Sequence, residues 1–269
     1  REGVDYEVVV RDAQGDLPTL NTMVDAALGE NADMVYTITS PALQVAMNKV
    51  RDRPVLYTLA IDPLLLGDAG THEKHRPNVA GIYDRSPFEP MMELIKECLP
   101  NARRIGTLYC PAEVNSVNFR EEMEKAAKAA GLELITLPSN TPGEVSDAIL
   151  ALLQRRPDLV CQINDNIHEA AFAGIAQAAQ RARVPVFSFS VGLVHQGASV
   201  VLSNDHYDGG RESGLIAARI IRGEEPADIP YSGIRKTKLL VNPQTAGEVG
   251  LAIPASVLNR ADVVVKDGE

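Results

Sequence analysis

Short apolar runs alternate along this chain with stretches in which apolar residues recur every three or four positions. The runs predict β-strands at residues 6–10, 34–38, 55–60, 105–109, 132–137, 159–163, 186–189 and 199–202. In the first helical stretch the apolar positions have the spacing of one buried helix face: Leu20, Met23, Val24, Ala27 and Leu28. Near-continuous apolar strands joined by helices are typical of parallel sheets covered on both faces. We therefore expect an α/β protein with doubly wound parallel sheets.

Two of the predicted helices are expected to begin at capping boxes. Residues 86–89 (SPFE) and 141–144 (TPGE) each place a hydroxyl at the N-cap, proline at the first helical position and glutamate two residues later. The apolar stripes that follow each box predict helices packed on a sheet.

The chain is expected to form two lobes. A polar stretch at residues 67–78 interrupts the alternation, and we expect crossings between lobes near residues 84–86, 203–207 and 232–235. A length of 269 residues is enough for two domains. The predicted lobes are residues 1–84 with 206–232, and residues 85–205 with 233–269. Three crossings would make a hinge on which the lobes close around a ligand.

Composition and charge exclude some classes of function. A formal net charge of −10 argues against nucleic-acid binding, which needs a basic face. No stretch approaches the roughly 18 apolar residues of a membrane span, and residues 1–20 do not read as a signal peptide, so we expect a mature, trimmed or cytosolic chain. Cys98, Cys110 and Cys161 lack CxxC spacing, which favours packed or reduced thiols, with one disulfide in an oxidising compartment as the alternative.

Candidate ligand-binding residues follow the predicted strands, where short polar side chains and helix N-termini meet at one edge of a parallel sheet. They include Thr39, Ser40, Asp62, Asn115, Ser116, Asp165 and Asn166. Each has a structural alternative: Ser40 and Asp165 are suited to be helix N-caps, and Asp62 is suited to a turn before proline. Asp165 follows a strand too apolar to end at ordinary solvent, and its carboxylate can pair with an ammonium group.

Two further strand ends carry candidates with open roles. Ser188 and Phe189 end one strand, where Phe189 offers an apolar wall or packs in the core. Asn204 and Asp205 close the next strand near the predicted hinge; one is expected to bind ligand, while the other caps the helix or ties the lobes together.

Enzyme motifs are absent from the sequence. The glycine-rich stretch at residues 209–214 lacks both the GK[ST] ending and the GxGxxG spacing of phosphate loops, and residues 187–192 are not a GxSxG nucleophile elbow. His72 and His75 do not form HExxH, and we expect a surface role for both in the polar stretch. His168, His195 and His206 are isolated in the sequence. We predict no catalytic residue, no metal site and no cofactor.

Several motifs taken together resemble one protein family across essentially the whole chain. They are ITSPALQ, RPVLYTLAIDPLLLG, RPNVAGIYD, LIKECLPNARRIGTLYCPAEVNS, INDN, SNDHYDGGRESG, LIAARIIRGEEPADIPY and LVNPQTAGEVGLAIP. This order is similar to the substrate-binding proteins of ABC importers of the tryptophan/tyrosine type, which resemble type I periplasmic binding proteins. The combination is more specific than any single motif.

The resemblance implies a function for the predicted edge. The expected ligand is a small molecule, an amino acid and in particular an aromatic one, captured between the lobes and presented to ABC permease subunits. It also implies a periplasmic or extracellular location, with lipid anchoring left open. The alternative is an extracellular input domain of a signalling protein, which shares the fold.

One departure from the family concerns the first predicted strand. Family members begin with a strand, a ligand-contacting loop and a helix before the segment matched by residues 2–16, and these are missing here. In the doubly wound order 2-1-3-4-5 that strand is central, so we expect an unpaired edge inside the sheet. We also expect either a longer natural chain or a missing piece supplied in another way.

Overall fold

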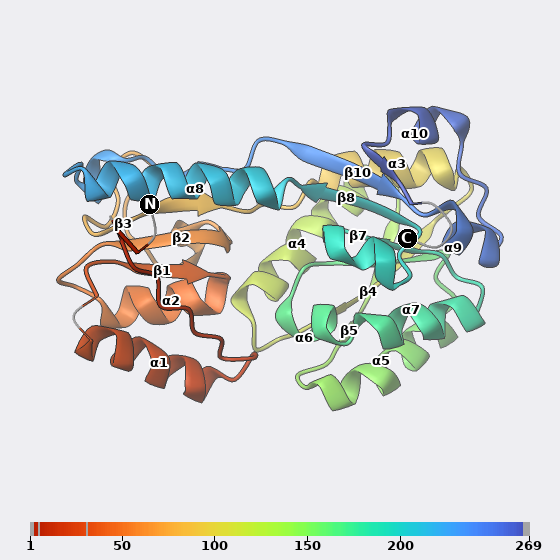
Figure 1. Ribbon diagram of the computed structural model, residues 1–269. Helices are drawn as coiled ribbons and strands as arrows, with labels where there is room; N and C mark the ends of the chain where they lie inside the picture. The colour runs from red at the N-terminus through yellow and green to blue at the C-terminus, as the bar shows by residue number, and fades with distance from the viewer. Residues whose placement is uncertain (1–2, 5, 31, 266–269) are drawn as a thin grey trace.

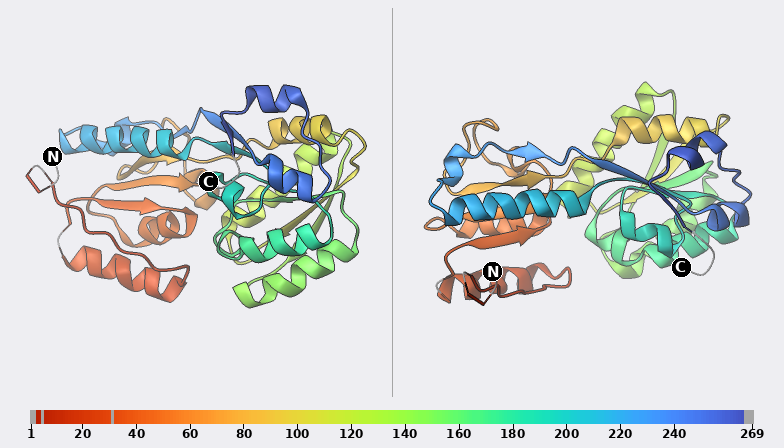
Figure 2. Two further views of the ribbon diagram at one scale, coloured as in Figure 1. Left: turned by 45° about the vertical axis from the view of Figure 1, so that its right-hand side comes forward. Right: turned by 45° about the horizontal axis from the view of Figure 1, so that its top comes forward.

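The computed structural model describes residues 3–4, 6–30 and 32–265 and arranges them in two α/β lobes (Figures 1 and 2). Each lobe has its own sheet with helices on both faces, and the chain passes between the lobes three times. The expected fold class, two doubly wound α/β lobes with a three-segment hinge, is confirmed. The predicted lobe limits themselves stay a prediction, and residues 1–2 and 266–269 within them lie outside the described residues.

Lobe 1 contains a parallel sheet with the strand order β1-β2-β3-β9. Its strands are β1 (Val35–Ile38), β2 (Val55–Ala60), β3 (Val79–Tyr83) and β9 (Ser232–Gly233). Its helices are α1 (Leu17–Gly29), α2 (Ser40–Lys49), η1 (Pro63–Leu66), α8 (His206–Ile221) and η3 (Pro226–Asp228). One apolar cluster joins α1 and α2 to one face of the sheet, and a second joins α8 to the opposite face.

Lobe 2 contains a larger sheet with the order β11-β10-β8-β7-β6-β4-β5, in which the pairing of β10 with β8 is antiparallel. Its strands are β4 (Arg104–Tyr109), β5 (Glu133–Pro138), β6 (Leu159–Gln162), β7 (Val186–Ser188), β8 (Val200–Asn204), β10 (Thr237–Val241) and β11 (Val263–Val264). Its helices are α3 (Phe88–Cys98), α4 (Val114–Ala129), α5 (Pro142–Gln154), α6 (Asn166–Ala170), α7 (Phe172–Arg181), η2 (Val191–Gln196), α9 (Pro243–Glu248) and α10 (Ala255–Arg260).

The core of lobe 2 explains why its strands read as continuous apolar runs. β6 is buried at all four positions, since α3 and α4 cover one face of the sheet while α5 and α7 cover the other. Buried apolar area is the main favourable contribution to folding. The packed core of lobe 2 therefore holds the residues at its strand ends in fixed positions.

Both capping boxes are wrong in their details. α3 begins at Phe88 with Pro87 at the N-cap, and the buried Ser86 hydroxyl has no hydrogen-bond partner. Thr141 is the N-cap of α5 but makes no side-chain cap bond, and Glu144 accepts instead from the backbone N–H of Asn140 at 2.7 Å. In both cases a helix forms where the apolar pattern predicts it. The side-chain hydrogen bonds of a capping box are not formed at its start.

The predicted strand at residues 6–10 is also wrong. Tyr6 makes an isolated bridge, residues 7–10 have no regular structure, and Val10 is 84% exposed. β1 pairs with β2 on one side, and no described strand pairs with its other side, so the unpaired edge lies at the end of the sheet and not inside it, where we expected it. A strand needs a hydrogen-bonding neighbour, so the apolar run at residues 6–10 is not sufficient to form one.

All three cysteines are buried free thiols, as the favoured alternative predicted. Burial raises the pKa of Cys98 to about 11, and burial also raises the pKa values of Cys110 and Cys161. These thiols pack as small apolar side chains.

Candidate ligand-binding site

The carboxyl ends of the strands in each lobe face the other lobe. β3 ends where the chain leaves for α3 in lobe 2, and β8 ends where the chain leaves for α8 in lobe 1 (Figure 1). Since parallel neighbours end at the same edge, β1 and β2 also point toward lobe 2, and β4, β6 and β7 point toward lobe 1. α2 contacts α4, and Ile61, which follows β2, is buried in the apolar core of lobe 2. Ligands of open α/β sheets bind outside such edges.

The end of β1 carries local backbone strain. Thr39 has φ 83° and ψ 156°, a conformation that is rare for a β-branched residue. Ser40 is the first residue of α2 and Thr39 is the N-cap, so the expected N-cap role of Ser40 is wrong. The Ser40 hydroxyl accepts from the backbone N–H of Ile61 at 3.0 Å and ties the ends of β1 and β2 together. Strain of this kind is often found at ligand sites.

Asp62 joins a turn to an aromatic pair at the same edge of lobe 1. Its Oδ1 accepts from the backbone N–H of Leu64 at 3.0 Å, the turn role that the sequence allowed. Its Oδ2 lies 2.6 Å from Nε2 of His72, and the His72 ring stacks on Tyr83 with ring centroids 5.4 Å apart. His72 is half-buried in this group, and the half-buried His75 stacks on Tyr231. Both histidines therefore also take part in packing, and their expected surface role stays a prediction.

Lobe 2 presents a buried polar network at the ends of β4, β5 and β6. The Asp165 carboxylate accepts from Ser116 Oγ at 2.7 Å, from the backbone N–H of His168 at 2.8 Å and from His168 Nδ1 at 2.7 Å. Asp165 is the N-cap of α6, as one alternative predicted, and its side chain is 0% exposed. In this conformation its carboxylate therefore has no free surface for a ligand.

Beside this network lie one carboxylate with hydrogen-bond donors and two amide oxygens without them. Oε2 of the half-buried Glu113 accepts from Asn166 Nδ2 at 2.6 Å and from Asn115 Nδ2 at 3.3 Å. The side-chain oxygens of Asn115 and Asn164 are buried without a hydrogen-bond partner. Buried polar atoms are rarely left unpaired. In this conformation the two oxygens have no exposed surface, so a donor from outside the described chain reaches them only when neighbouring side chains move.

The end of β7 is packed as core. Phe189 is fully buried, with its ring centroid 5.0 Å from that of Phe88. Ser188 is also fully buried, and its hydroxyl accepts from the backbone N–H of Ser190 at 3.2 Å. Ligand contact by Ser188 and Phe189 stays a prediction for which this conformation offers no exposed surface.

The hinge side of the edge is held by Asn204, Asp84 and His206. Asn204 Nδ2 donates to the Asp84 carboxylate and, at 2.9 Å, to the carbonyl of Arg85, so it ties the two lobes. Asp205 caps α8 by accepting from the backbone N–H of Asp208 at 3.2 Å. Burial disfavours the charged ring of His206, but Asp84, 3.2 Å away, together with Glu169 and Asp205, raises the pKa of His206 above its ordinary value.

Sequence reasoning missed four residues that take part in this edge. Glu113 and Asn164 lie one or two positions before residues that were predicted, and Asp84 lies in a predicted crossing. His168 was considered isolated, although it lies three positions after Asp165 at the start of a helix. That spacing puts both side chains on one face and could have indicated the pair.

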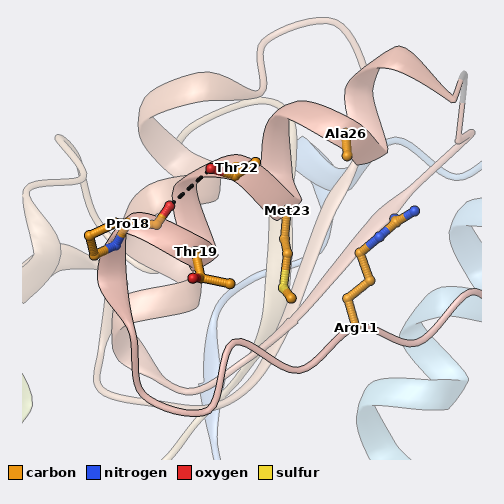
Figure 3. Close-up of a pocket in the computed structure, with 6 residues that line it drawn as sticks. All are labelled: Arg11, Pro18, Thr19, Thr22, Met23 and Ala26. Atoms are coloured by element: carbon orange, nitrogen blue, oxygen red, sulfur yellow. Dashed lines mark hydrogen bonds between the residues drawn. The ribbon is translucent and has the colours of Figure 1, made fainter.

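A hollow of about 410 Å³ lies elsewhere, on the surface of α1 beside the N-terminal segment (Figure 3). Arg11, Thr22 and Met23 are among its lining residues, and none belongs to the strand ends of either lobe. Within residues 3–4, 6–30 and 32–265, no cluster of three or more metal-ligating side chains occurs. In the same part of the chain, no helix combines the length and apolar character that crossing a membrane requires.

The two-lobed fold and the polar strand ends define a ligand-binding protein, and comparison with known families agrees. The model of the family "ABC transporter substrate binding protein" matches residues 2–265, and the chain belongs to this family. A protein named "Tyrosine-binding protein" from Clostridioides difficile is 27% identical over 91% of this chain and 71% of that protein.

Two solved structures of related proteins differ in their ligand state. The ABC domain in complex with L-Trp from Streptococcus pneumonia is 28% identical, with a TM-score of 0.90 over 96% of this chain and 90% of that one. The ligand-free, open structure of a substrate binding protein with adhesive properties from Clostridium difficile is 27% identical, with a TM-score of 0.73 over 99% of this chain and 89% of that one.

Proposed function

We propose that this chain is the extracytoplasmic receptor of an ABC importer and that it captures an aromatic amino acid between its lobes for delivery to the permease. Membership of the substrate-binding family supports the receptor class. The tyrosine-binding relative and the L-Trp complex support the ligand class.

The observation that carries the proposal is the set of oxygen acceptors at the end of lobe 2. The oxygens of Asn115 and Asn164 are buried and unpaired, and the Glu113 carboxylate accepts from Asn115 Nδ2 at 3.3 Å. An α-ammonium group has three N–H donors and a positive charge, so it would satisfy both amide oxygens and compensate the carboxylate.

The other two parts of an aromatic amino acid also have partners at this edge. α2 and α4 begin here, and backbone N–H groups in their first turns favour an anion such as the α-carboxylate. The stacked rings of His72 and Tyr83 provide an aromatic surface on the lobe 1 side. Asp62, hydrogen-bonded to His72, would hold this surface in place.

The arrangement of the lobes supports capture by closure. The two solved relatives have nearly equal identity to this chain, but the TM-score is higher for the L-Trp complex than for the ligand-free, open structure. The lobes here are therefore arranged more as in the complex. A ligand that contacts both lobes favours that arrangement, since it gains contacts only when they are close.

Titration calorimetry of the protein with L-tryptophan, L-tyrosine and L-phenylalanine tests the proposal. We expect saturable binding of at least one of them, and much weaker binding of tryptamine and N-acetyl-tryptophan, which lack the carboxylate and the ammonium group respectively. Asn115→Ala should weaken binding by about 5- to 100-fold, because a buried acceptor for the ligand is lost. Asn48→Ala, at an exposed position of α2, is the matched control.

Two results would contradict the proposal. Absence of any heat with all three amino acids, with a response to a sugar or another organic acid, would keep the family and overturn the ligand class. Equal affinity in Asn115→Ala and Asn48→Ala would show that the first turn of α4 does not bind the ammonium group. Uptake of the labelled amino acid by cells with and without the protein then tests transport.

A further inference from the structure

Three strand–helix turns of lobe 2 are joined by one buried chain of hydrogen bonds. Ser139, which follows β5, lies 2.6 Å from His168 Nε2, and His168 Nδ1 lies 2.7 Å from the Asp165 carboxylate. Asp165 in turn accepts from Ser116 Oγ at 2.7 Å, and Ser116 Oγ accepts from the backbone N–H of Cys110 at 2.8 Å. The chain of bonds therefore connects the ends of β6, β4 and β5, the last three strands on one side of the sheet.

The chemistry of these groups sets the direction of the bonds. A carboxylate only accepts, so His168 Nδ1 and the Ser116 hydroxyl both donate to Asp165. With the ring in the Nδ1–H tautomer, Nε2 is free to accept the hydroxyl hydrogen of Ser139. Each side-chain polar atom of this chain then has a partner, and such fully satisfied buried networks fix a single arrangement of the groups they join.

The order serine, histidine, aspartate is that of a hydrolase triad, but the serine is not available to a substrate. Ser139 is 1% exposed and His168 is 0% exposed. An attacking hydroxyl needs room beside it for the reacting carbonyl, and these burials leave none. The same burial makes the network suited to holding neighbouring groups in position.

We propose that His168 is a positioning residue for the ligand site: it orients Asp165 and, through Asp165, sets Ser116 and the first turn of α4. The inference rests on the proposed function, since Asn115 in that turn carries one of the unpaired oxygens assigned to the ligand ammonium. Asp165 itself has no exposed surface, so it acts through Ser116 and α6.

Two substitutions of His168 separate positioning from packing. In His168→Asn the side-chain amide lies near the place of Nδ1 and keeps a donor for Asp165. In His168→Gln the amide reaches toward Ser139 and leaves Asp165 without that donor. We expect His168→Gln to weaken L-tryptophan or L-tyrosine binding by about tenfold or more, and His168→Asn to stay within about threefold of the wild type.

Two buried serines of lobe 2 provide a matched pair. Ser139→Ala removes the partner of His168 Nε2, whereas the hydroxyl of the fully buried Ser199 has no hydrogen-bond partner. We expect Ser139→Ala, like His168→Asn, to stay within about threefold of the wild type, because the donor to Asp165 is kept, and Ser199→Ala to leave affinity unchanged. Equal affinities for His168→Asn and His168→Gln, or a loss of affinity in Ser139→Ala as large as in His168→Gln, would overturn the inference.

A ligand-free readout keeps the inference apart from the proposed function. In ¹⁵N spectra without ligand, the backbone amides of Asn115 and Ser116 should shift in His168→Gln more than in His168→Asn. If the wild type binds no amino acid while these shifts differ as expected, the proposed ligand fails and the positioning role stands. If the wild type binds an amino acid while the two variants give the same spectra, the positioning role fails.

Discussion

The two lobes have the same α/β architecture but differ in how completely their helices are buried against the sheet. In lobe 2, α7 buries Phe172, Ile175, Ala176 and Ala179 against the sheet, whereas in lobe 1 the longer α1 buries only Val24. Among the strands that the structure describes, none pairs with the outer edge of β1, and its Tyr36 and Ile38 are 46% and 54% exposed. Local stability follows buried contacts and protected hydrogen bonds, so the α1–β1 side of lobe 1 is expected to open more readily than the α7 side of lobe 2.

The two lobes also differ in the groups that they place at the candidate site. The end of lobe 2 carries a satisfied buried network, while the end of lobe 1 carries the strained Thr39 and the half-buried pair of His72 and Tyr83. A rigid lobe that positions polar groups and a more adaptable lobe that closes over the ligand would suit capture by hinge closure.

Core truncations in the two lobes should differ most. Phe172→Ala in α7 should cost about 3–5 kcal/mol of unfolding free energy, because it leaves a large cavity in a fully buried position. Val24→Ala in α1 should cost less than about 2 kcal/mol, the value for two buried methyl-sized groups. Urea unfolding followed by circular dichroism measures both, and equal costs would contradict the contrast between the lobes.

The hinge should give a smaller, pH-dependent effect. The pKa of His206 is raised in the folded protein, so its pairing with Asp84 stabilises fully below the ordinary histidine pKa and is lost as pH rises through the raised value. His206→Gln should therefore cost about 1 kcal/mol near pH 6 and less near pH 8.5.

Thermal unfolding of wild type and variant at the two pH values measures this dependence. The control is His195→Gln, at an exposed position of lobe 2, which should follow the wild type at both values. A stability difference that stays constant with pH in His206→Gln would show that the ion pair does not hold the hinge.

The smallest effect is expected at the open edge of lobe 1. Ile38→Lys should change the unfolding free energy by no more than about 0.5 kcal/mol, because the side chain is exposed and lysine is tolerated on edge strands. Val35→Lys, on the buried face of the same strand, should destabilise strongly because it places an unpaired charge in the core. If Ile38→Lys cost as much as Val35→Lys, the edge would not be open in solution.

Much of the architecture could be predicted from the apolar pattern. Residues 105–109 and 159–163 were expected as strands and correspond to β4 and β6, because a strand buried on both faces must be apolar throughout. The run at residues 6–10 is also mostly apolar but forms no strand, because a strand also needs a partner for its hydrogen bonds. Pattern alone does not supply that partner.

The candidate site residues could be placed at one edge from the sequence more easily than their individual roles could be assigned. The strand-end rule placed Ser116, Asp165 and Asn204 at one edge, yet their partners are His168, Ser139 and Asp84. Ser139 lies 29 residues from His168, and Asp84 lies 120 residues from Asn204. Hydrogen bonds over such separations depend on how the strands are ordered.

The sequence by itself determined the alternation of strands and helices, the burial of the central strands and the polar character of the strand ends, since these follow from local periodicity and side-chain chemistry. The tertiary structure decided which polar groups are already satisfied within the chain. It joined Asp165 to His168 and Ser116, turned Phe189 into the core and left the oxygens of Asn115 and Asn164 without a partner. The physical reason is that a hydrogen bond requires two groups to meet within about 3 Å, and only the folded chain brings them together.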